Sequence, residues 1–145
     1  MQFRHPRDRT LRLLTGLAGV LYVGSVFADD LTGSDSLLCY GLSAARCATG
    51  EACESVEPWK LNIPDFVKLD LRAKRIQTTA ASKDNRETPL QTVQRSNGTI
   101  LVQGLQGERA FSWLITETSG EGTLSVAGVG QGVTVFTVCT PVDKL

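Results

Sequence analysis

The sequence predicts an all-β domain: a small antiparallel meander of about seven or eight strands, forming a barrel-like or sandwich domain stapled by disulfides. Three observations lead to this prediction. Short apolar–polar alternations recur about every ten residues in the second half of the chain, Gly- and Asn-rich turns separate them, and four cysteines follow a stretch with the features of a signal peptide. No segment keeps the 3.6-residue period of an amphipathic helix.

Residues 1–28 have the charge and hydropathy pattern of a cleavable secretory signal peptide. Four arginines and one aspartate precede an uncharged run at 13–27, and Val26 and Ala28 occupy the positions that a signal peptidase reads. The apolar run is about 15 residues long, shorter than the roughly 20 that span a bilayer. We therefore expect a periplasmic or secreted protein, of bacterial type, with no stable membrane insertion after cleavage.

The chain after the signal peptide has the size of a single domain and a mildly acidic balance. Without the four arginines and one aspartate of residues 1–28, the remaining 117 residues hold 11 basic and 14 acidic side chains, a net charge of −3. Nucleic-acid binding needs a basic surface, so a nucleic-acid partner is not expected. We expect residues 29–36 to be a flexible N-terminus and residues 37–145 to form one β domain.

All four cysteines follow the signal peptide, and an even number in an exported chain predicts two disulfides. Three connectivities are open. The sequence favours Cys47–Cys53, which would close a short loop, together with Cys39–Cys139, which antiparallel pairing of the first and last strands would bring together. A four-thiolate zinc site is the rival, but it needs pairs of cysteines two to four residues apart, which this spacing lacks. We expect no metal and no cofactor.

The expected elements follow in order along the chain. A first apolar strand at 37–42 leads into a disulfide-pinned loop at 43–58, with room for one helical turn near Ala44. The remaining strands are expected at 66–71, 74–78, 90–95, 99–105, 109–117, 123–127 and 133–140. A long polar turn is expected at 79–88, and Asn97-Gly98 predicts a type I′ hairpin turn.

Short turns between consecutive strands predict that each strand pairs with the next. A closed barrel would hide the sheet edges and suits pairing of the first strand with the last, while a two-sheet sandwich is the alternative. This build is similar to that of the small periplasmic lysozyme inhibitors, which are disulfide-linked β-barrels. The similarity is one of architecture, and no motif carries residues from that family to this chain.

A catalytic role is not expected. The only histidine, His5, lies in the predicted signal peptide, so a Ser-His-Asp or Cys-His arrangement is excluded after cleavage. A hydrolase would have to rely on carboxylates or lysine. Glu51, Glu54 and Glu57 recur every third residue and would converge on a helix, yet a solvated acidic loop is the simpler interpretation, with a weak calcium site as the alternative.

The two tryptophans receive different predictions. Trp113 alternates with Phe111 and Ile115, which predicts a core position. Trp59 follows the cysteine loop beside Pro58, where it could pack in the core or anchor a partner. The candidate partner-binding residues are Trp59, Glu51, Glu54 and Glu57.

These observations favour a non-catalytic domain that binds a protein or a cell-envelope component, with enzyme inhibition as one such role. The alternatives are a carrier of a small apolar ligand inside the barrel and a histidine-free hydrolase. An exposed, disulfide-supported loop cluster at 43–59 would favour the first function. An apolar cavity in the barrel would favour the second.

Overall fold

The computed structural model describes residues 30–82 and 84–142, so the predicted signal peptide lies outside the described residues. The strands are β1 Ser36–Ala48, β2 Glu54–Val56, β3 Phe66–Asp70, β4 Arg75–Thr78, β5 Glu87–Ser96, β6 Thr99–Gln106, β7 Arg109–Thr116, β8 Glu121–Gly128 and β9 Gln131–Pro141. Two short 3-10 helices, η1 Pro58–Leu61 and η2 Ala80–Ser82, complete the regular structure of this part of the chain. Neither is long and apolar enough to cross a membrane.

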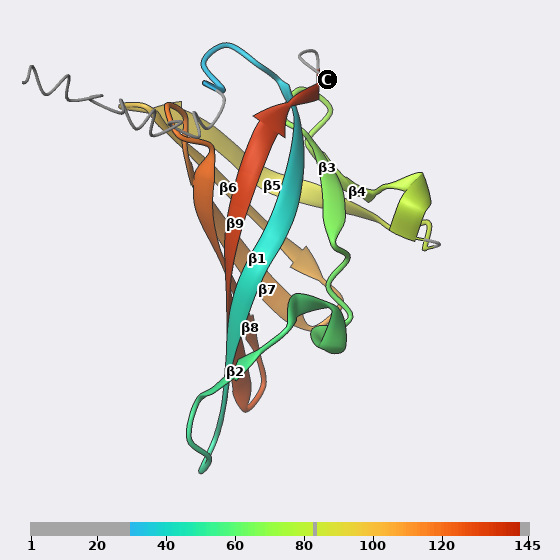
Figure 1. The fold of residues 1–145 in the computed structure, drawn as a ribbon, viewed down its shortest axis with the longest axis vertical. Helices are drawn as coiled ribbons and strands as arrows, with labels where there is room; N and C mark the ends of the chain where they lie inside the picture. Colours follow the sequence, from blue (N-terminus) through green and yellow to red (C-terminus); the bar gives the residue numbers. More distant parts are fainter. Residues whose placement is uncertain (1–29, 83, 143–145) are drawn as a thin grey trace, which may run out of the picture.

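Eight of the strands close into one antiparallel barrel, and β2 is an additional strand beside β1. The order around the barrel is β1, β3, β4, β5, β6, β7, β8, β9, and β9 pairs back onto β1. Figure 1 shows β1 (cyan) and β9 (red) side by side along much of their length. The predicted antiparallel meander is confirmed in its barrel form, and the two-sheet sandwich is excluded.

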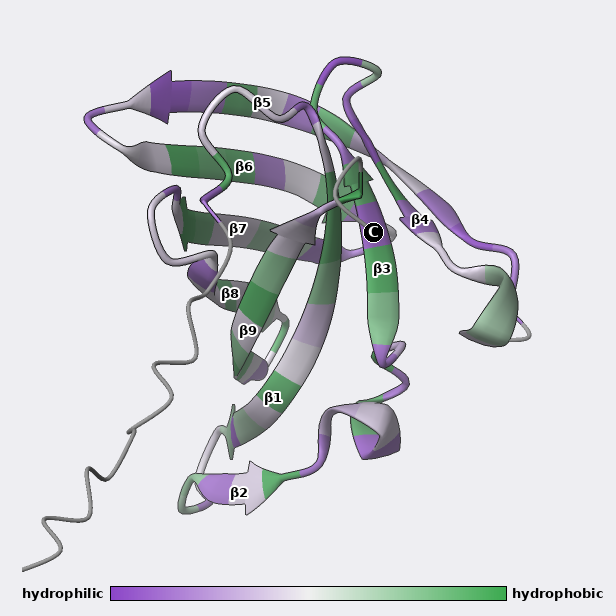
Figure 2. Ribbon diagram, turned by 45° about the horizontal axis from the view of Figure 1, so that its top comes forward, coloured by the Kyte–Doolittle hydropathy of each residue, from purple (hydrophilic) through white to green (hydrophobic). Residues whose placement is uncertain are grey.

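The period-two alternation of the sequence places successive side chains inside and outside the barrel. On β7, Trp113 and Ile115 are buried, while Leu114 between them is exposed. On β6, Ile100 and Val102 are buried in the same way. Figure 2 shows apolar (green) stretches on β6 and β7, which include exposed as well as buried side chains, so burial and not hydropathy alone marks the inner face. The inward side chains therefore define one interior that runs from end to end of the barrel.

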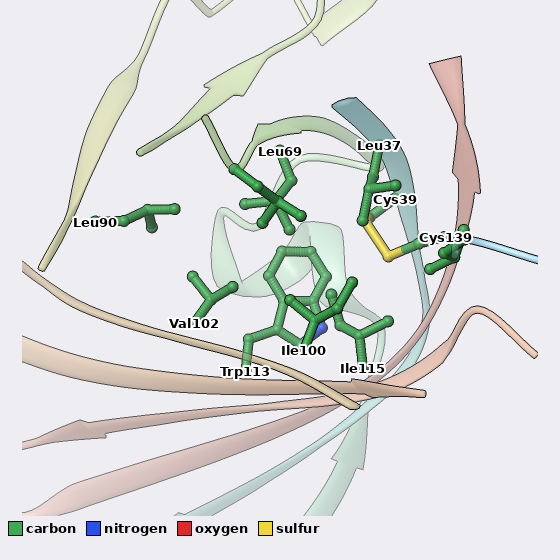
Figure 3. Packing of buried hydrophobic residues seen from close by; sticks show 11 residues of the cluster. Leu37, Cys39, Leu69, Leu90, Ile100, Val102, Trp113, Ile115 and Cys139 are labelled. Atoms are coloured by element: carbon green, nitrogen blue, oxygen red, sulfur yellow. A yellow bond between two sulfur atoms is a disulfide. The ribbon is translucent and has the colours of Figure 1, made fainter. Parts of the chain in front are cut away.

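The interior is densely packed around the indole of Trp113. Figure 3 shows this ring reaching from β7 toward Leu69, with the Cys39–Cys139 disulfide beside Leu37. Trp113 is 1% exposed, which confirms its predicted core position. The buried cluster consists of Leu31, Leu37, Cys39, Leu69, Leu71, Leu90, Ile100, Val102, Trp113, Ile115 and Cys139.

Both predicted disulfides are present, Cys39 with Cys139 and Cys47 with Cys53. Cys39 and Cys139 lie opposite each other in the β1–β9 ladder, so this bridge crosses the seam that closes the barrel. Disulfides persist in oxidising, extracellular-type environments, and the two bridges indicate such an environment for this domain.

The segment before β1 closes one end of the barrel. The side chain of Leu31 is fully buried, and its N–H donates to the carbonyl oxygen of Glu117 at 2.8 Å. The N–H of Leu71 donates to the carbonyl oxygen of Asp35, also at 2.8 Å. The sequence predicts a flexible N-terminus at 29–36, whereas this structure holds its described part in place. A single buried leucine among polar residues makes the difference, and no periodicity signals it.

β1 is longer than the sequence predicts, because it continues through residues 43–48. The predicted loop with a helical turn is wrong over this stretch: Ala44 is buried and lies opposite Val135 of β9. A register shift between Gly41 and Ser43 marks a bulge at which the strand changes direction. Small side chains give little hydrophobic signal of their own, so here the partner strand determines the conformation.

Gly120 fixes the turn between β7 and β8, and its replacement should be strongly destabilising. Its φ is +66°, and a Cβ there would overlap the carbonyl oxygen of Cys139. We expect Gly120→Ala to lower the free energy of unfolding by about 2–4 kcal/mol, measured by denaturant unfolding. Gly107→Ala is the control: φ is +60°, but the added Cβ meets open space, so a loss of about 1 kcal/mol is expected. Equal losses would contradict the role of the close approach.

Candidate functional site

The barrel contains a cavity of about 130 Å³ on the side of Trp113 that faces away from Leu31. Leu31 binds Glu117, just after the end of β7, whereas the cavity lining includes Arg109 at the start of β7. The two therefore lie toward opposite ends of the barrel. All eight barrel strands contribute to the wall. Its apolar side chains are Cys39, Leu61, Ile63, Pro64, Val67, Ile76, Phe111, Leu124 and Val135, beside the floor residue Trp113.

Trp113 separates the cavity from the packed core. Its indole N–H donates a hydrogen bond to Oγ1 of Thr137 at 3.0 Å. Gly122 makes room for this pair, since a Cβ there would lie 2.8 Å from Thr137 Oγ1 and 2.9 Å from Trp113 Nε1. The hydrogen bond satisfies the one polar atom of the buried ring, so the floor of the cavity has no indole donor left to bind water.

The segment that contains η1 forms one wall of the cavity. Side chains three residues apart share a face of a 3-10 helix, so Pro58 is buried and Leu61 lines the cavity, while Trp59 points away. Asn62 ends the helix with a φ of +56°. Its carbonyl oxygen accepts a hydrogen bond from Nη2 of Arg86 at 3.0 Å, which ties this wall to the residues before β5.

Two inward-facing glycines explain why the space is left unfilled. At Gly41, an added Cβ would contact Pro58 and Val135 at 3.4–3.5 Å, so the cavity borders bare backbone there. At Gly104, an added Cβ would lie 2.6 Å from Cζ of Phe111. The phenyl ring therefore lies against β6, in the place of the missing side chain.

Arginine side chains line the cavity and a hollow beside it. Arg86 and Arg109 line it, and Arg109 also lines an adjoining hollow of about 100 Å³ together with Arg46. Leu61 and Ile63 separate the two spaces, since both line each of them. The lining thus combines apolar side chains with a basic rim, the arginines Arg46, Arg86 and Arg109.

Trp59, one of the predicted partner-binding residues, is 61% exposed. The Nζ atom of Lys60 lies 5.4 Å from the centroid of its ring, a cation–π distance. This exposure excludes a core position for Trp59, which was one of its two predicted roles; the other, an anchor for a partner, stays open. Trp59 belongs to the segment that walls the cavity but takes no part in the lining.

The three predicted glutamates are exposed and do not converge, because β2 is extended where a helix would have been needed. Glu54 forms an ion pair with Arg46 at 2.5 Å across the β1–β2 ladder, and Glu57 shares a shallow polar hollow with it. Glu51 lies in the loop between Cys47 and Cys53. Within residues 30–82 and 84–142, no three acidic, cysteine or histidine side chains are placed to hold a metal ion.

The sequence offered a barrel cavity only as an alternative and gave no lining residues, although two signals for its position were present. Arg109 shares its strand face with Phe111 and Trp113, so a core assignment for those rings also directs the arginine toward the interior. Gly41 and Gly104 fall on inward positions of their strands, where a glycine leaves volume unfilled.

Fold and site together define a class: an eight-stranded antiparallel β-barrel with an apolar cavity toward one end and a basic rim. Comparison of the chain with protein-family models, curated proteins and solved structures finds no match. The function must therefore follow from the geometry of the barrel itself.

Proposed function

We propose that this protein is a non-catalytic binding domain that takes a small apolar ligand, or the apolar end of one, into the barrel. One observation carries the proposal: a largely apolar cavity of about 130 Å³ with the buried indole of Trp113 as its floor. Ligand sites are typically concave and mostly apolar, with a few polar groups that fix orientation. Arg86 and Arg109 supply such groups at the rim.

The volume limits what is bound. An apolar cavity of about 150 Å³ is enough to hold benzene, so the buried part of the ligand is of that size or slightly smaller. Drug-sized ligands occupy about 300–1,000 Å³, which this cavity does not offer. A single ring or a short branched alkyl group fits these limits.

The place of action forms part of the proposal. The signal-peptide pattern of residues 1–28 and the two disulfides support export to the periplasm or outside the cell. The only histidine lies in that leader, which supports binding in place of histidine-dependent catalysis. A domain of this kind would carry or sequester its ligand outside the reducing cytoplasm.

Tryptophan fluorescence offers a direct test. The chain has two tryptophans, so Trp59→Phe leaves Trp113, the cavity floor, as the only reporter. We expect titration of the mature, oxidised Trp59→Phe protein with neutral phenylacetamide to change the Trp113 emission and its indole N–H resonance. A ligand with so few atoms should bind with a dissociation constant on the order of 1 mM or below.

A pair of variants on β8 shows whether the probe enters the cavity. Leu124→Phe adds atoms to the lining of a cavity of about benzene size and should weaken binding about 10-fold or more, since one methylene of misfit in an apolar pocket already costs about that much. Ser125→Phe places the same side chain on the exposed face of the strand and should leave binding unchanged. An unperturbed Trp113 signal at saturating probe, or equal effects of the two variants, would refute the proposal.

A second candidate function is the binding of a protein or cell-envelope partner through Trp59. The specific observation in its favour is a large aromatic side chain, 61% exposed, on a segment anchored by buried Pro58. Pull-down from envelope extract with the mature protein and with Trp59→Ala would test it. A partner retained by both proteins would rule out Trp59 as the anchor.

A further inference from the structure

The ligand of the cavity has a second chemical requirement. We propose that it carries an anionic group next to its apolar part, and that the guanidinium of Arg109 binds this group. The inference rests on the proposed binding function and adds the class of ligand: a small carboxylate, or another small anion, with one apolar group of about benzene size.

The charged side chains that line the cavity and the adjoining hollow are all arginines. Arg86 and Arg109 line the cavity, and Arg46 and Arg109 line the adjoining hollow, while no aspartate or glutamate lines either space. The chain after the signal peptide has a net charge of −3, so an all-arginine set of charged lining residues is not a consequence of composition. Such a rim attracts anions and disfavours cations.

Two of these arginines already have partners. Arg46 is paired with Glu54 at 2.5 Å, and Arg86 is paired with Asp84 while it donates to the carbonyl oxygen of Asn62. Both therefore hold the walls of the site together. Among the residues that the structure describes, the Arg109 guanidinium has no hydrogen-bond or ion-pair partner, so it is the one of the three that is available to a ligand.

The position of Arg109 suits this role. It begins β7 on the same face as Phe111 and Trp113, so its side chain stands above the cavity wall and floor. Its stem lies beside Gly128 of β8, where a Cβ would be in ordinary contact with Cγ of the arginine at 3.5 Å. A ligand with its ring against Trp113 would meet the arginine at the point where it leaves the cavity.

Arginine is well matched to the proposed group. The guanidinium presents N–H donors in a planar fork that fits a carboxylate with two parallel hydrogen bonds. A partly exposed charge of this kind contributes less than a buried one, so we expect a preference for the anion of about 10-fold over a neutral ligand of the same shape.

Three probes that share one phenyl group test the inference: phenylacetate, phenylacetamide and phenethylamine. Affinity is measured by Trp113 fluorescence in the Trp59→Phe protein and checked by calorimetry. Phenylacetate is expected to bind about 10-fold more tightly than the amide, and the amine more weakly than either. The preference for the anion should fall as salt is raised, because the rim is open to solvent.

Two variants of equal charge change provide the control. In Arg109→Gln, phenylacetate should bind no better than phenylacetamide, while the affinity of the amide stays as it was. Arg72→Gln removes the same charge from an exposed side chain of the β3–β4 turn, outside the cavity lining, and should leave the preference intact. The second variant separates a contact in the site from a change in net charge.

The outcomes distinguish this inference from the proposed function. If phenylacetamide and phenylacetate bind equally well, the cavity binds apolar ligands but Arg109 does not select an anion, and the inference is overturned alone. A preference that survives Arg109→Gln would likewise overturn it. If none of the three probes binds, the proposed function is refuted and the inference with it.

Discussion

Replacing Cys39 and Cys139 together by alanine is expected to lower the free energy of unfolding by about 4–5 kcal/mol. The two residues are 100 positions apart in the sequence, and a cross-link that closes so long a loop strongly restricts the unfolded chain. Both side chains are also buried in the core, so the change removes packing as well as the cross-link. Equilibrium unfolding in guanidinium chloride, under oxidising conditions, measures the loss.

The other disulfide provides a matched control. Cys47 and Cys53 are only 6 positions apart and exposed, so Cys47→Ala with Cys53→Ala should cost about 2 kcal/mol by the same chain-entropy argument. Double replacement in each case avoids a free thiol. If the two double variants lose equal stability, loop length does not govern the effect, and the seam bridge has no special importance.

Trp113→Ala is expected to cost about 3–5 kcal/mol, the range for loss of a buried tryptophan. The ring is 1% exposed and lines the cavity, so its removal would enlarge the cavity toward the core. It would also leave the hydroxyl of Thr137, which is 5% exposed, without the indole donor. Trp59→Ala is the natural control, because its side chain is mostly exposed and should cost well under 1 kcal/mol.

Trp113→Phe separates the packing of the ring from its hydrogen bond. This variant keeps an aromatic ring and removes the N–H, so a loss of about 1–3 kcal/mol is expected from the unsatisfied Thr137 hydroxyl and the smaller ring. Adding Thr137→Val should recover part of the loss, because the stranded hydroxyl is then absent. Failure of the second change to recover any stability would show that the hydrogen bond contributes nothing.

The strands from residue 66 onward could be predicted from the sequence because each carries its own alternation and its own turn. Asn97 and Gly98, for example, both have positive φ, as the expected type I′ turn requires. The disulfide pairing followed from the same topology, since a barrel brings its first and last strands together. In these regions local sequence and global fold agree.

The rest depended on contacts that no local pattern reveals. The second half of β1 is built of small residues that become a strand only against β9, and Leu31 is buried only because a barrel end is there to receive it. Trp59 could not be assigned because one turn of 3-10 helix decides which of its neighbours face inward. The cavity arises where inward positions on several strands carry small or no side chains. These positions can be recognised in the sequence only after it is known which residues of each strand face inward.

Pairing of β1 with β9 has a consequence for the order in which the protein folds. The barrel cannot close until β9, its last strand, is available. Almost the whole chain must therefore be present before the β1–β9 pairing, the most extensive in the barrel, can form. Contacts between residues so far apart in the sequence form slowly, and until they form the strand edges remain unpaired and prone to aggregation. The Cys47–Cys53 bridge can be made early from neighbouring residues, whereas Cys39 must stay reduced, or be rescued from a wrong partner, until Cys139 arrives.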